Sequence, residues 1–278
     1  MRFLAARPGF SGAQVVIQGV PYDGGVSWRR GAAGGPAAIR AASDSIESYS
    51  PGLQRDREDL DLADIGDIAL DGLRGPSMVE RVAGATETLA RRGARIATLG
   101  GDHSVSIGTA AGLRAVHPEL VQVVFDAHLD LRADHEGDRF SHACGTRRMA
   151  EAGTTVALGI RSGARAEFED AERMLLAWSP DLALPTKARR AIGRRPVFVS
   201  VDLDVLDPGV FAAVGNPEPA GATYRGLLDA LLALGGLEVV AVDFLECAPR
   251  LDPSGASAVI AAELVREAIL GVLVPGVV

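Results

Sequence analysis

Residues 120–130 read "LVQVVFDAHLD", an apolar run that ends in three ionisable residues at alternating positions. Asp126, His128 and Asp130 stand two residues apart, and side chains at this spacing point to one face of an extended chain. The three side chains project together if the extended conformation continues past Phe125. Because a buried strand rarely spends three positions on ionisable groups at its end, the segment predicts both a strand and a ligand site.

Six further apolar runs, rich in β-branched residues, predict the other strands of the same sheet. Several are apolar nearly throughout, which is typical of parallel strands covered by helices on both faces. Helical spacing predicts helices between them, and this alternation implies right-handed crossovers and one parallel sheet between helix layers. The runs lie at 13–20, 61–68, 94–100, 154–160, 195–202 and 237–244, and the clearest helices at 75–93, 223–236 and 254–273.

Composition bounds the class of protein without giving its chemistry. Of 278 residues, 47% are hydrophobic and 23% are charged, which is an ordinary globular balance. No internal repeat or linker is visible, so one domain over 1–278 is expected, with the Gly/Pro-rich segments 19–36 and 207–221 as active-site loops. The net charge of −8 argues against a nucleic-acid partner and is compatible with a cationic small substrate.

The expected location follows from three further features. No apolar stretch approaches the eighteen or so residues that cross a bilayer, so no membrane partner is expected. The apolar patch near the N-terminus is too short for a secretory signal. Cys144 and Cys247 stand far apart in no paired spacing, so a reducing, cytoplasmic environment is expected and a disulfide is not.

Two other strand ends also carry ionisable residues. Asp202 and Asp204 follow "PVFVSV", and "LGGDHSVS" (99–106) presents Asp102 and His103 after a glycine pair. Ligand sites of open α/β sheets lie beyond the carboxyl ends of the strands. We therefore expect one cluster made by His103, Asp126, His128, Asp130, Asp202 and Asp204.

Such a cluster has a physical meaning, because four neighbouring carboxylates repel and each resists ionisation. Divalent cations remove that repulsion, and ligands dominated by carboxylate oxygen, with one imidazole per ion, favour two Mn²⁺ ions over Zn²⁺. Two ions roughly 3.5–4 Å apart can activate a bridging water, so the cluster predicts a hydrolase. Taken singly, each motif has a simpler role: "DLD" as a cap or a Mg²⁺ contact, and "GGDH" as a tight turn.

Other ionisable residues are less informative alone. His142 in "RFSHACG" is a loop histidine, a type most often solvated, and Glu246 in "DFLECAP" follows another apolar strand and could bind a cation. His117, before a proline, is expected to be structural, and His135, in an acidic loop, is expected to face solvent. Cys144 is expected to be a packed thiol.

The motifs together resemble those of the ureohydrolase family, which comprises arginases, agmatinases and their relatives. The segments "GGDHS" (100–104), "DAHLD" (126–130) and "SVDLDVLDP" (200–208) are similar to its three metal motifs. The matches run in the expected order over nearly the whole chain. The resemblance implies a three-layer α/β/α sandwich around a mostly parallel eight-stranded sheet, with two Mn²⁺ ions per subunit.

The resemblance also implies a role for each matching residue. His103 and Asp130 would bind the first Mn²⁺, His128 and Asp204 the second, and Asp126 and Asp202 would bridge both. Activated water would attack the guanidinium carbon, and the tetrahedral intermediate would collapse to urea and an amine. Asp130 would move a proton to the leaving nitrogen, His142 would act as proton shuttle, and Glu246 would hold the guanidinium.

The substrate is expected from the loop "LRADHEGDRFS" (131–141). Arginase-like members carry Asn, Thr and Ser here to bind an α-carboxylate and α-amine, whereas this loop offers Asp134, Glu136 and Asp138. An acidic wall favours a substrate with a cationic far end. With "ESYSP", "DIGDI" and "VGNPEP", the loop is similar to archaeal and thermophile-type agmatinases, so agmatine is expected, with putrescine as the amine product.

Several alternatives stay open. Aminopropylagmatine fits almost as well as agmatine, and guanidinobutyrate hydrolysis, arginase and formiminoglutamase activities are further possibilities within the family. A deacetylase of related architecture with one catalytic Zn²⁺ is an alternative from another enzymatic class, and a non-catalytic regulatory relative that binds a partner protein is the third. The resemblance implies a homo-oligomer, trimer or hexamer. The segment "RRGAAGGP" (29–36) departs from the usual "RPGARFGP", and Ala220 replaces a glycine, which bears on substrate and on subunit contacts.

Overall fold

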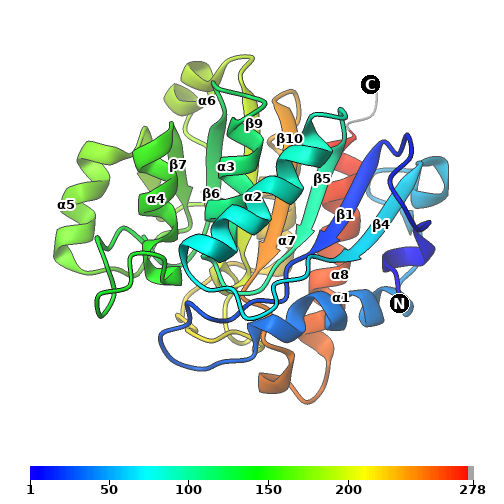
Figure 1. The fold of residues 1–278 in the computed structure, drawn as a ribbon, viewed down its shortest axis with the longest axis horizontal. Helices are drawn as coiled ribbons and strands as arrows, with labels where there is room; N and C mark the ends of the chain where they lie inside the picture. The colour runs from blue at the N-terminus through cyan, green and yellow to red at the C-terminus, as the bar shows by residue number, and fades with distance from the viewer. Residues whose placement is uncertain (275–278) are drawn as a thin grey trace.

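The computed structural model describes residues 1–274 and contains an eight-stranded sheet in which every neighbouring pair of strands is parallel (Figure 1). The strand order is β4-β1-β5-β10-β9-β6-β7-β8. The α/β sandwich expected from the sequence is confirmed. The strands are β1 (Val15–Gly19), β4 (Leu62–Asp67), β5 (Arg95–Leu99), β6 (Val121–Phe125), β7 (Thr155–Leu158), β8 (Ala177–Ser179), β9 (Pro196–Asp202) and β10 (Glu238–Leu245).

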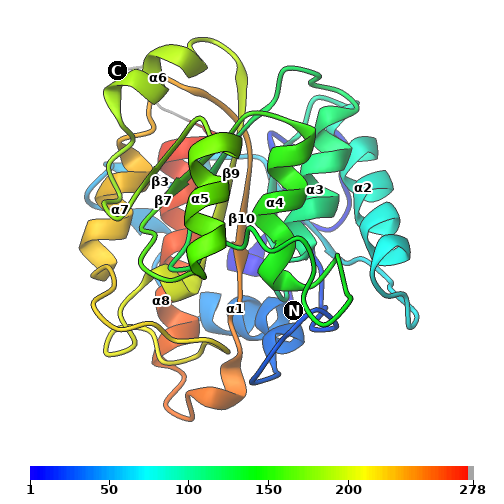
Figure 2. The ribbon, with the colours of Figure 1, turned by 90° about the vertical axis from the view of Figure 1, so that its left-hand side faces the viewer.

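Helices cover both faces of the sheet, and Figure 2 shows the two layers with the strands between them. One large hydrophobic cluster lies between the sheet and each layer, and a smaller one lies beneath the helix over 165–174. One layer contains α2 (Pro76–Ala90), α3 (Val105–Arg114), α4 (Gly145–Ala152) and α5 (Arg165–Met174). The other contains α1 (Gly35–Ser43), α6 (Thr186–Ile192), α7 (Tyr224–Leu232) and α8 (Ala256–Ala268), which continues as a π turn over Ile269–Leu273.

The two large clusters, one on each face of the sheet, explain why the strands are apolar throughout. In β6, Val121, Val123 and Phe125 belong to the core beneath α7 and α8, whereas Val124 belongs to the core beneath α2 and α3. All four side chains are fully buried. Successive strand residues point to opposite faces, so a strand covered on both sides buries every position.

The predicted strands and helices are largely confirmed. All seven apolar runs form strands, and their ends agree within two residues. The eighth strand, β8, escaped prediction because it has only three half-buried residues at the sheet edge. A small separate hairpin, β2 (Tyr49–Ser50) with β3 (Arg55–Asp56), was also not predicted. Within residues 1–274, no helix is long and apolar enough to span a bilayer.

A buried ion pair ties α1 to β4 at the edge of the sheet. Arg40 Nε and Nη2 donate to the two carboxylate oxygens of Asp64 at 2.8 and 3.0 Å, and both side chains are almost fully buried. The backbone N–H of Phe3 donates to the same carboxylate, so the N-terminal segment is held there too. Burial raises the pKa of Asp64, but the Arg40 guanidinium outweighs it and lowers the pKa below the ordinary carboxyl value.

We expect Arg40→Met to destabilise the protein by about 3–5 kcal/mol at pH 7, because it leaves the Asp64 carboxylate buried without its partner. In the variant, burial raises the pKa of Asp64, so acidification towards pH 4 protonates the carboxyl and narrows the difference from wild type. Denaturant unfolding at several pH values measures both effects. Arg91→Met, which removes an exposed pair with Glu87, is the control and costs less than about 1 kcal/mol. An equal loss for both variants would contradict this account.

Candidate metal centre

The predicted site residues follow four strands that are neighbours at the centre of the sheet. His103 follows β5, Glu246 follows β10, Asp202 ends β9, and Asp126 follows β6. These strands lie in the order β5-β10-β9-β6, so their carboxyl ends meet at one edge. The separate sequence motifs therefore meet in space because each one follows a strand at the same edge of the sheet.

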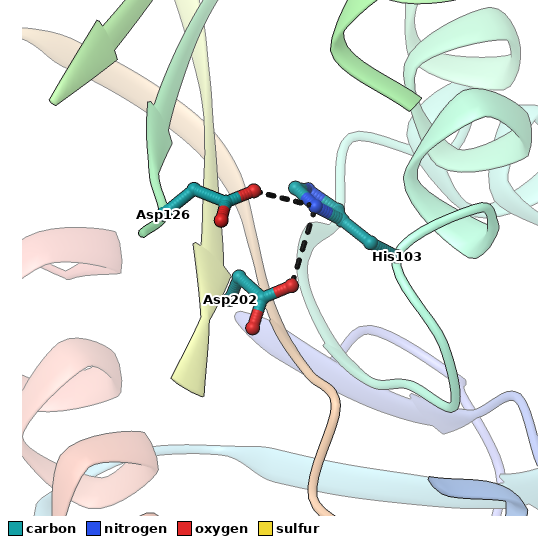
Figure 3. A group of neighbouring side chains, drawn as sticks. All are labelled: His103, Asp126 and Asp202. Carbon is teal, nitrogen blue, oxygen red and sulfur yellow. Dashed lines mark ion pairs between the residues drawn. The ribbon is translucent and has the colours of Figure 1, made fainter. Parts of the chain in front are cut away.

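One half of the cluster surrounds the imidazole of His103 (Figure 3). Its Nδ1 lies 2.9 Å from Asp126 Oδ2, 3.0 Å from Asp130 Oδ2 and 3.3 Å from Asp202 Oδ2. His103, Asp126 and Asp202 have ligand atoms close enough to share one ion. His103 and Asp126 are completely buried, and little of Asp202 is exposed.

The other half surrounds His128. Its Nδ1 lies 2.9 Å from Asp204 Oδ2 and 3.6 Å from Asp126 Oδ1, and these three residues also have the spacing to share one ion. Asp126 belongs to both halves, with one carboxylate oxygen towards each histidine. The two groups are therefore adjacent, and a carboxylate lies between them.

The backbone brings these residues together differently from the prediction. β6 ends at Phe125 and does not continue as an extended strand, so the alternation argument for Asp130 is wrong. Asp130 reaches His103 from a left-handed conformation, with φ of 49°. Asp204 likewise lies in a 3₁₀ turn (Leu203–Val205), where its N–H donates to the Asp202 carboxylate. Turns after the strands, rather than the strand pleat, aim these carboxylates.

A close approach explains the glycine pair before His103. A Cβ on Gly101 would lie only 1.7 Å from the Tyr22 carbonyl oxygen, so no other residue fits there. Next to it, Asp102 is buried and accepts hydrogen bonds from the N–H groups of Gly25 and Ser104. Asp102 therefore fastens the first loop to the His103 turn instead of joining the metal cluster.

The electrostatics of the cluster fit divalent cations. Burial lowers the pKa of His103, but the surrounding Asp126, Asp130 and Asp202 carboxylates outweigh it and raise the pKa well above the ordinary value. Burial and neighbouring carboxylates both raise the pKa of Asp202. The Oδ2 atom of Asp126 is buried without a hydrogen bond, although His103 Nδ1 is 2.9 Å away. The cluster thus has more buried carboxylate oxygens than hydrogen-bond donors, together with two imidazoles. These are the ligand atoms of an oxygen-rich metal site.

His142 and Glu246 form a pair beside the cluster. His142 Nδ1 lies 2.9 Å from Glu246 Oε1, and the same oxygen accepts a hydrogen bond from the backbone N–H of His103. His142 Nε2 contacts the Ser27 hydroxyl at 2.8 Å. Burial lowers the pKa of His142, whereas Glu246 outweighs it and raises the pKa to about 9. Glu246 has a φ of 62° and is almost completely buried, so its position is tightly constrained.

A cavity of about 320 Å³ opens onto this cluster. Arg132, His135 and Glu167, none of which belongs to the cluster, form part of its wall, and Ser27 comes from the first loop. It is also lined by His128, Leu129, Asp130, His142, Ala143, Ser162, Gly163, Ala164, Asp202, Asp204 and Asn216.

The cavity corrects two expectations about the loops. Asp134, Glu136 and Asp138 are exposed and do not line the cavity, so the predicted acidic wall is wrong. His135, expected to face solvent, is half-buried and does line it. None of residues 29–36 lines the cavity, although Arg29 donates to the carbonyls of Gly215 and Val214, next to the lining residue Asn216. The loop 131–141 turns so that Asp134, Glu136 and Asp138 face solvent, and the sequence of a loop does not specify the direction of its side chains.

Several residues of the site were not predicted. Ser27 beside His142, and Glu218 with Oε1 3.5 Å from His128 Nε2, are both close to the cluster. Both lie in the Gly/Pro-rich loops, and Glu218 lies in the "VGNPEP" segment, but neither signal singles out one residue. Cys144 is buried, as expected, and burial raises its pKa to about 11, so it is a packed thiol.

The fold and the donor set together define a metal-dependent class of hydrolase, and the sequence match identifies which one. The profile of the Arginase family matches residues 13–271, so the chain belongs to the arginase family. Similarity to agmatinases and other members shows that it is an amidinohydrolase, and the resemblance found in the motifs is confirmed.

Individual relatives align over most of their length. The agmatinase of Bacillus anthracis is 35% identical over 97% of this chain and 95% of its own. The N(1)-aminopropylagmatine ureohydrolase of Thermococcus kodakarensis is 34% identical over 85% of this chain and 83% of its own. The crystal structure of the agmatine ureohydrolase of Thermoplasma volcanium has a TM-score of 0.85 at 30% identity, covering 96% of this chain and 92% of that one.

Proposed function

We propose that this chain is a binuclear manganese ureohydrolase that cleaves the guanidinium group of agmatine, or of a close linear guanidino-amine, to urea and an amine such as putrescine. The observation that carries the proposal is the pair of histidine–carboxylate groups that share Asp126. A single-ion deacetylase needs one such group, and a non-catalytic relative needs neither.

The first Mn²⁺ would be held by His103 and Asp130 and the second by His128 and Asp204, with Asp126 and Asp202 shared between them. When bound, the ions lower the pKa of water and supply a nucleophile at neutral pH. Carboxylate oxygens and imidazole nitrogens suit Mn²⁺, and the described residues place no thiolate in the cluster.

The remaining steps belong to side chains beside the cluster. Both hydrogen bonds to the Glu246 carboxylate within residues 1–274 go to Oε1, which leaves Oε2 to accept from the substrate guanidinium. Asp130, at the cavity wall, takes a proton from the nucleophile and delivers it to the leaving nitrogen. His142 exchanges protons with solvent through the side facing Ser27 and the cavity. A leaving amine needs such an acid, because a neutral amine departs far more readily than its anion.

The amine end of the substrate is supported by the relatives and by one cavity residue. Two of the relatives described above are named for agmatine and one for aminopropylagmatine. Glu167 provides a carboxylate in the cavity wall that does not belong to the cluster. It is largely satisfied by the N–H groups of Leu131 and Ala164, so we expect it to favour an ammonium only moderately.

A guanidino acid such as guanidinobutyrate is the second candidate, and Arg132 is the observation that favours it. Arg132 lines the cavity, its side chain is 47% exposed, and its Nε lies 3.6 Å from Glu167. A guanidinium at this position could pair with a substrate carboxylate.

Urea release with Mn²⁺ from agmatine, aminopropylagmatine, guanidinobutyrate and arginine tests the substrate. We expect the two guanidino-amines to be hydrolysed with the highest kcat/KM. Arg132→Met is the matched variant: it should leave agmatine turnover nearly unchanged, and it would abolish a preference for guanidinobutyrate if one existed. Preferred hydrolysis of arginine or guanidinobutyrate by the wild type would overturn the proposed substrate.

Glu246→Gln is expected to raise KM and lower kcat while both ions remain bound. The amide removes the charge that pairs with the guanidinium, and charge-assisted hydrogen bonds contribute roughly 1.5–3 kcal/mol. Because Glu246 raises the pKa of His142, its loss should also move the His142 limb of the pH–rate profile to lower pH. Steady-state kinetics across pH, with metal analysis of the same sample, would measure this. Loss of metal from the variant would contradict it.

We also propose that the chain works as one domain over 1–278, in the cytoplasm, as a trimer or hexamer. The proposal rests on the continuous central sheet, which takes strands from Val15 to Leu245, and on the resemblance to the family. Light scattering of the purified chain measures the oligomeric state, and a monomer would contradict that part.

A further inference from the structure

A chain of buried polar groups leads from His103 away from the cavity into the protein. His103 Nε2 lies 3.2 Å from Ser200 Oγ, which lies 3.0 Å from Ser106 Oγ. Ser106 donates to Asp243 Oδ2 at 2.8 Å. All four side chains are completely buried. They come from the His103 turn, the central strands β9 and β10, and the overlying helix α3.

The direction of this chain is fixed by its last member. A carboxylate accepts hydrogen bonds and donates none, so Ser106 must direct its proton to Asp243. The oxygen of Ser106 is then free to accept from Ser200, and the oxygen of Ser200 is free to accept from His103 Nε2. Every hydroxyl in the chain thus donates towards Asp243, and the imidazole must carry its proton on Nε2.

In the neutral ring that a metal ion requires, a proton on Nε2 leaves the lone pair on Nδ1, the atom that faces Asp126, Asp130 and Asp202. Metal-binding histidines commonly donate their other N–H to an acceptor that fixes tautomer and ring orientation. A carboxylate buried away from solvent is costly, and Asp243 Oδ1 has no hydrogen-bond partner within the described chain. This cost is explained if the Asp243 carboxylate orients His103 for metal binding.

We propose that Asp243 is a positioning residue that acts through Ser106 and Ser200 to hold His103 in the tautomer and orientation needed to bind the first metal ion. This rests on the proposed function of the cluster as a binuclear site. Ser200 is the nearest acceptor, and its removal should have the largest effect.

The test is Ser200→Ala in the full chain, with Mn²⁺ affinity measured by competition with a chelator. We expect the affinity of one of the two sites to fall about 10- to 100-fold. The second readout is the ¹H–¹⁵N spectrum of histidine-labelled protein loaded with diamagnetic Zn²⁺. Wild type should show an exchange-protected Nε2–H on His103, and Ser200→Ala should lose that protection.

Thr98→Val is the matched control. Thr98 pairs in register with Asp243 on the neighbouring strand, is equally buried, and accepts from Gln18 without joining the chain to His103. This variant should keep both metal affinity and the Nε2–H signal, so a loss equal to that of Ser200→Ala would reduce the effect to general destabilisation and overturn the proposal.

Asp243→Asn keeps the test available if Ser200→Ala fails to fold. Asparagine can donate as well as accept, so the direction of the chain is no longer fixed, and we expect a smaller loss of affinity with weaker protection of Nε2–H. Wild-type affinity and protection in the foldable variants would overturn the proposal. A wild-type chain that binds no metal would instead defeat the proposed function itself, so the two failures are distinguishable.

Discussion

Asp126→Ala is expected to lose both metal ions and to abolish urea release. Asp126 directs one oxygen towards His103 and the other towards His128, so its removal takes a ligand from both groups at once. Without the ions the nucleophile is ordinary water, and several kcal/mol of barrier reduction disappear, which is a loss of roughly 10³-fold or more. Asp202→Ala, which removes the other carboxylate that we propose to be shared, should behave in the same way.

Metal content by mass spectrometry and urea release on the same samples measure this prediction. Asp134→Ala is the control, because this aspartate is exposed and does not line the cavity, so it should keep two ions and full activity. Retention of one firmly bound ion in Asp126→Ala would show that the carboxylate is not shared.

His142→Ala is expected to keep both ions and lose rate. His142 belongs to neither ion-sharing group; its Nδ1 bonds to Glu246 and its Nε2 to Ser27. Removal of a positioned proton carrier costs roughly 10²- to 10⁴-fold in rate. Glu246 raises the pKa of His142 to about 9, which places its protonated form at neutral pH, and cations bound nearby would lower that pKa towards neutrality.

The measurement is kcat together with metal content. His135→Ala is the matched control, since His135 also lines the cavity and is half-buried but lies outside the pair with Glu246. It should change kcat little. Loss of metal from His142→Ala would assign this histidine to the ligand set and contradict its role as a proton carrier.

The sequence predicted the fold well because buried parallel strands leave a strong signal. Val121, Val123, Val124 and Phe125 must all be apolar to fill two cores, and few other local structures require so continuous an apolar run. The edge strand β8 lacked this signal because its residues are only half-buried. Helix α4 was also missed: half of "GTRRMAEA" is polar, and of this helix only Met149 belongs to a hydrophobic cluster of the described residues.

The candidate site was predicted as a set of residues rather than as a geometry. Ionisable groups directly after strands gave the set, since central strands deliver their ends to one place. The aim of each side chain depends on turns such as the left-handed Asp130 and Glu246, which no periodicity specifies. The prediction of an acidic cavity wall was wrong for the same reason, because Asp134, Glu136 and Asp138 face outward. Ser200 and Asp243 looked like ordinary strand residues, and only their contacts reveal a connection to His103.

Diffraction from crystals grown with Mn²⁺, recorded at the manganese absorption edge, tests the central claim most directly. The account predicts two anomalous peaks, one among His103, Asp126, Asp130 and Asp202 and the other among His128, Asp126, Asp202 and Asp204. A single peak, or two peaks that share no carboxylate, would contradict it.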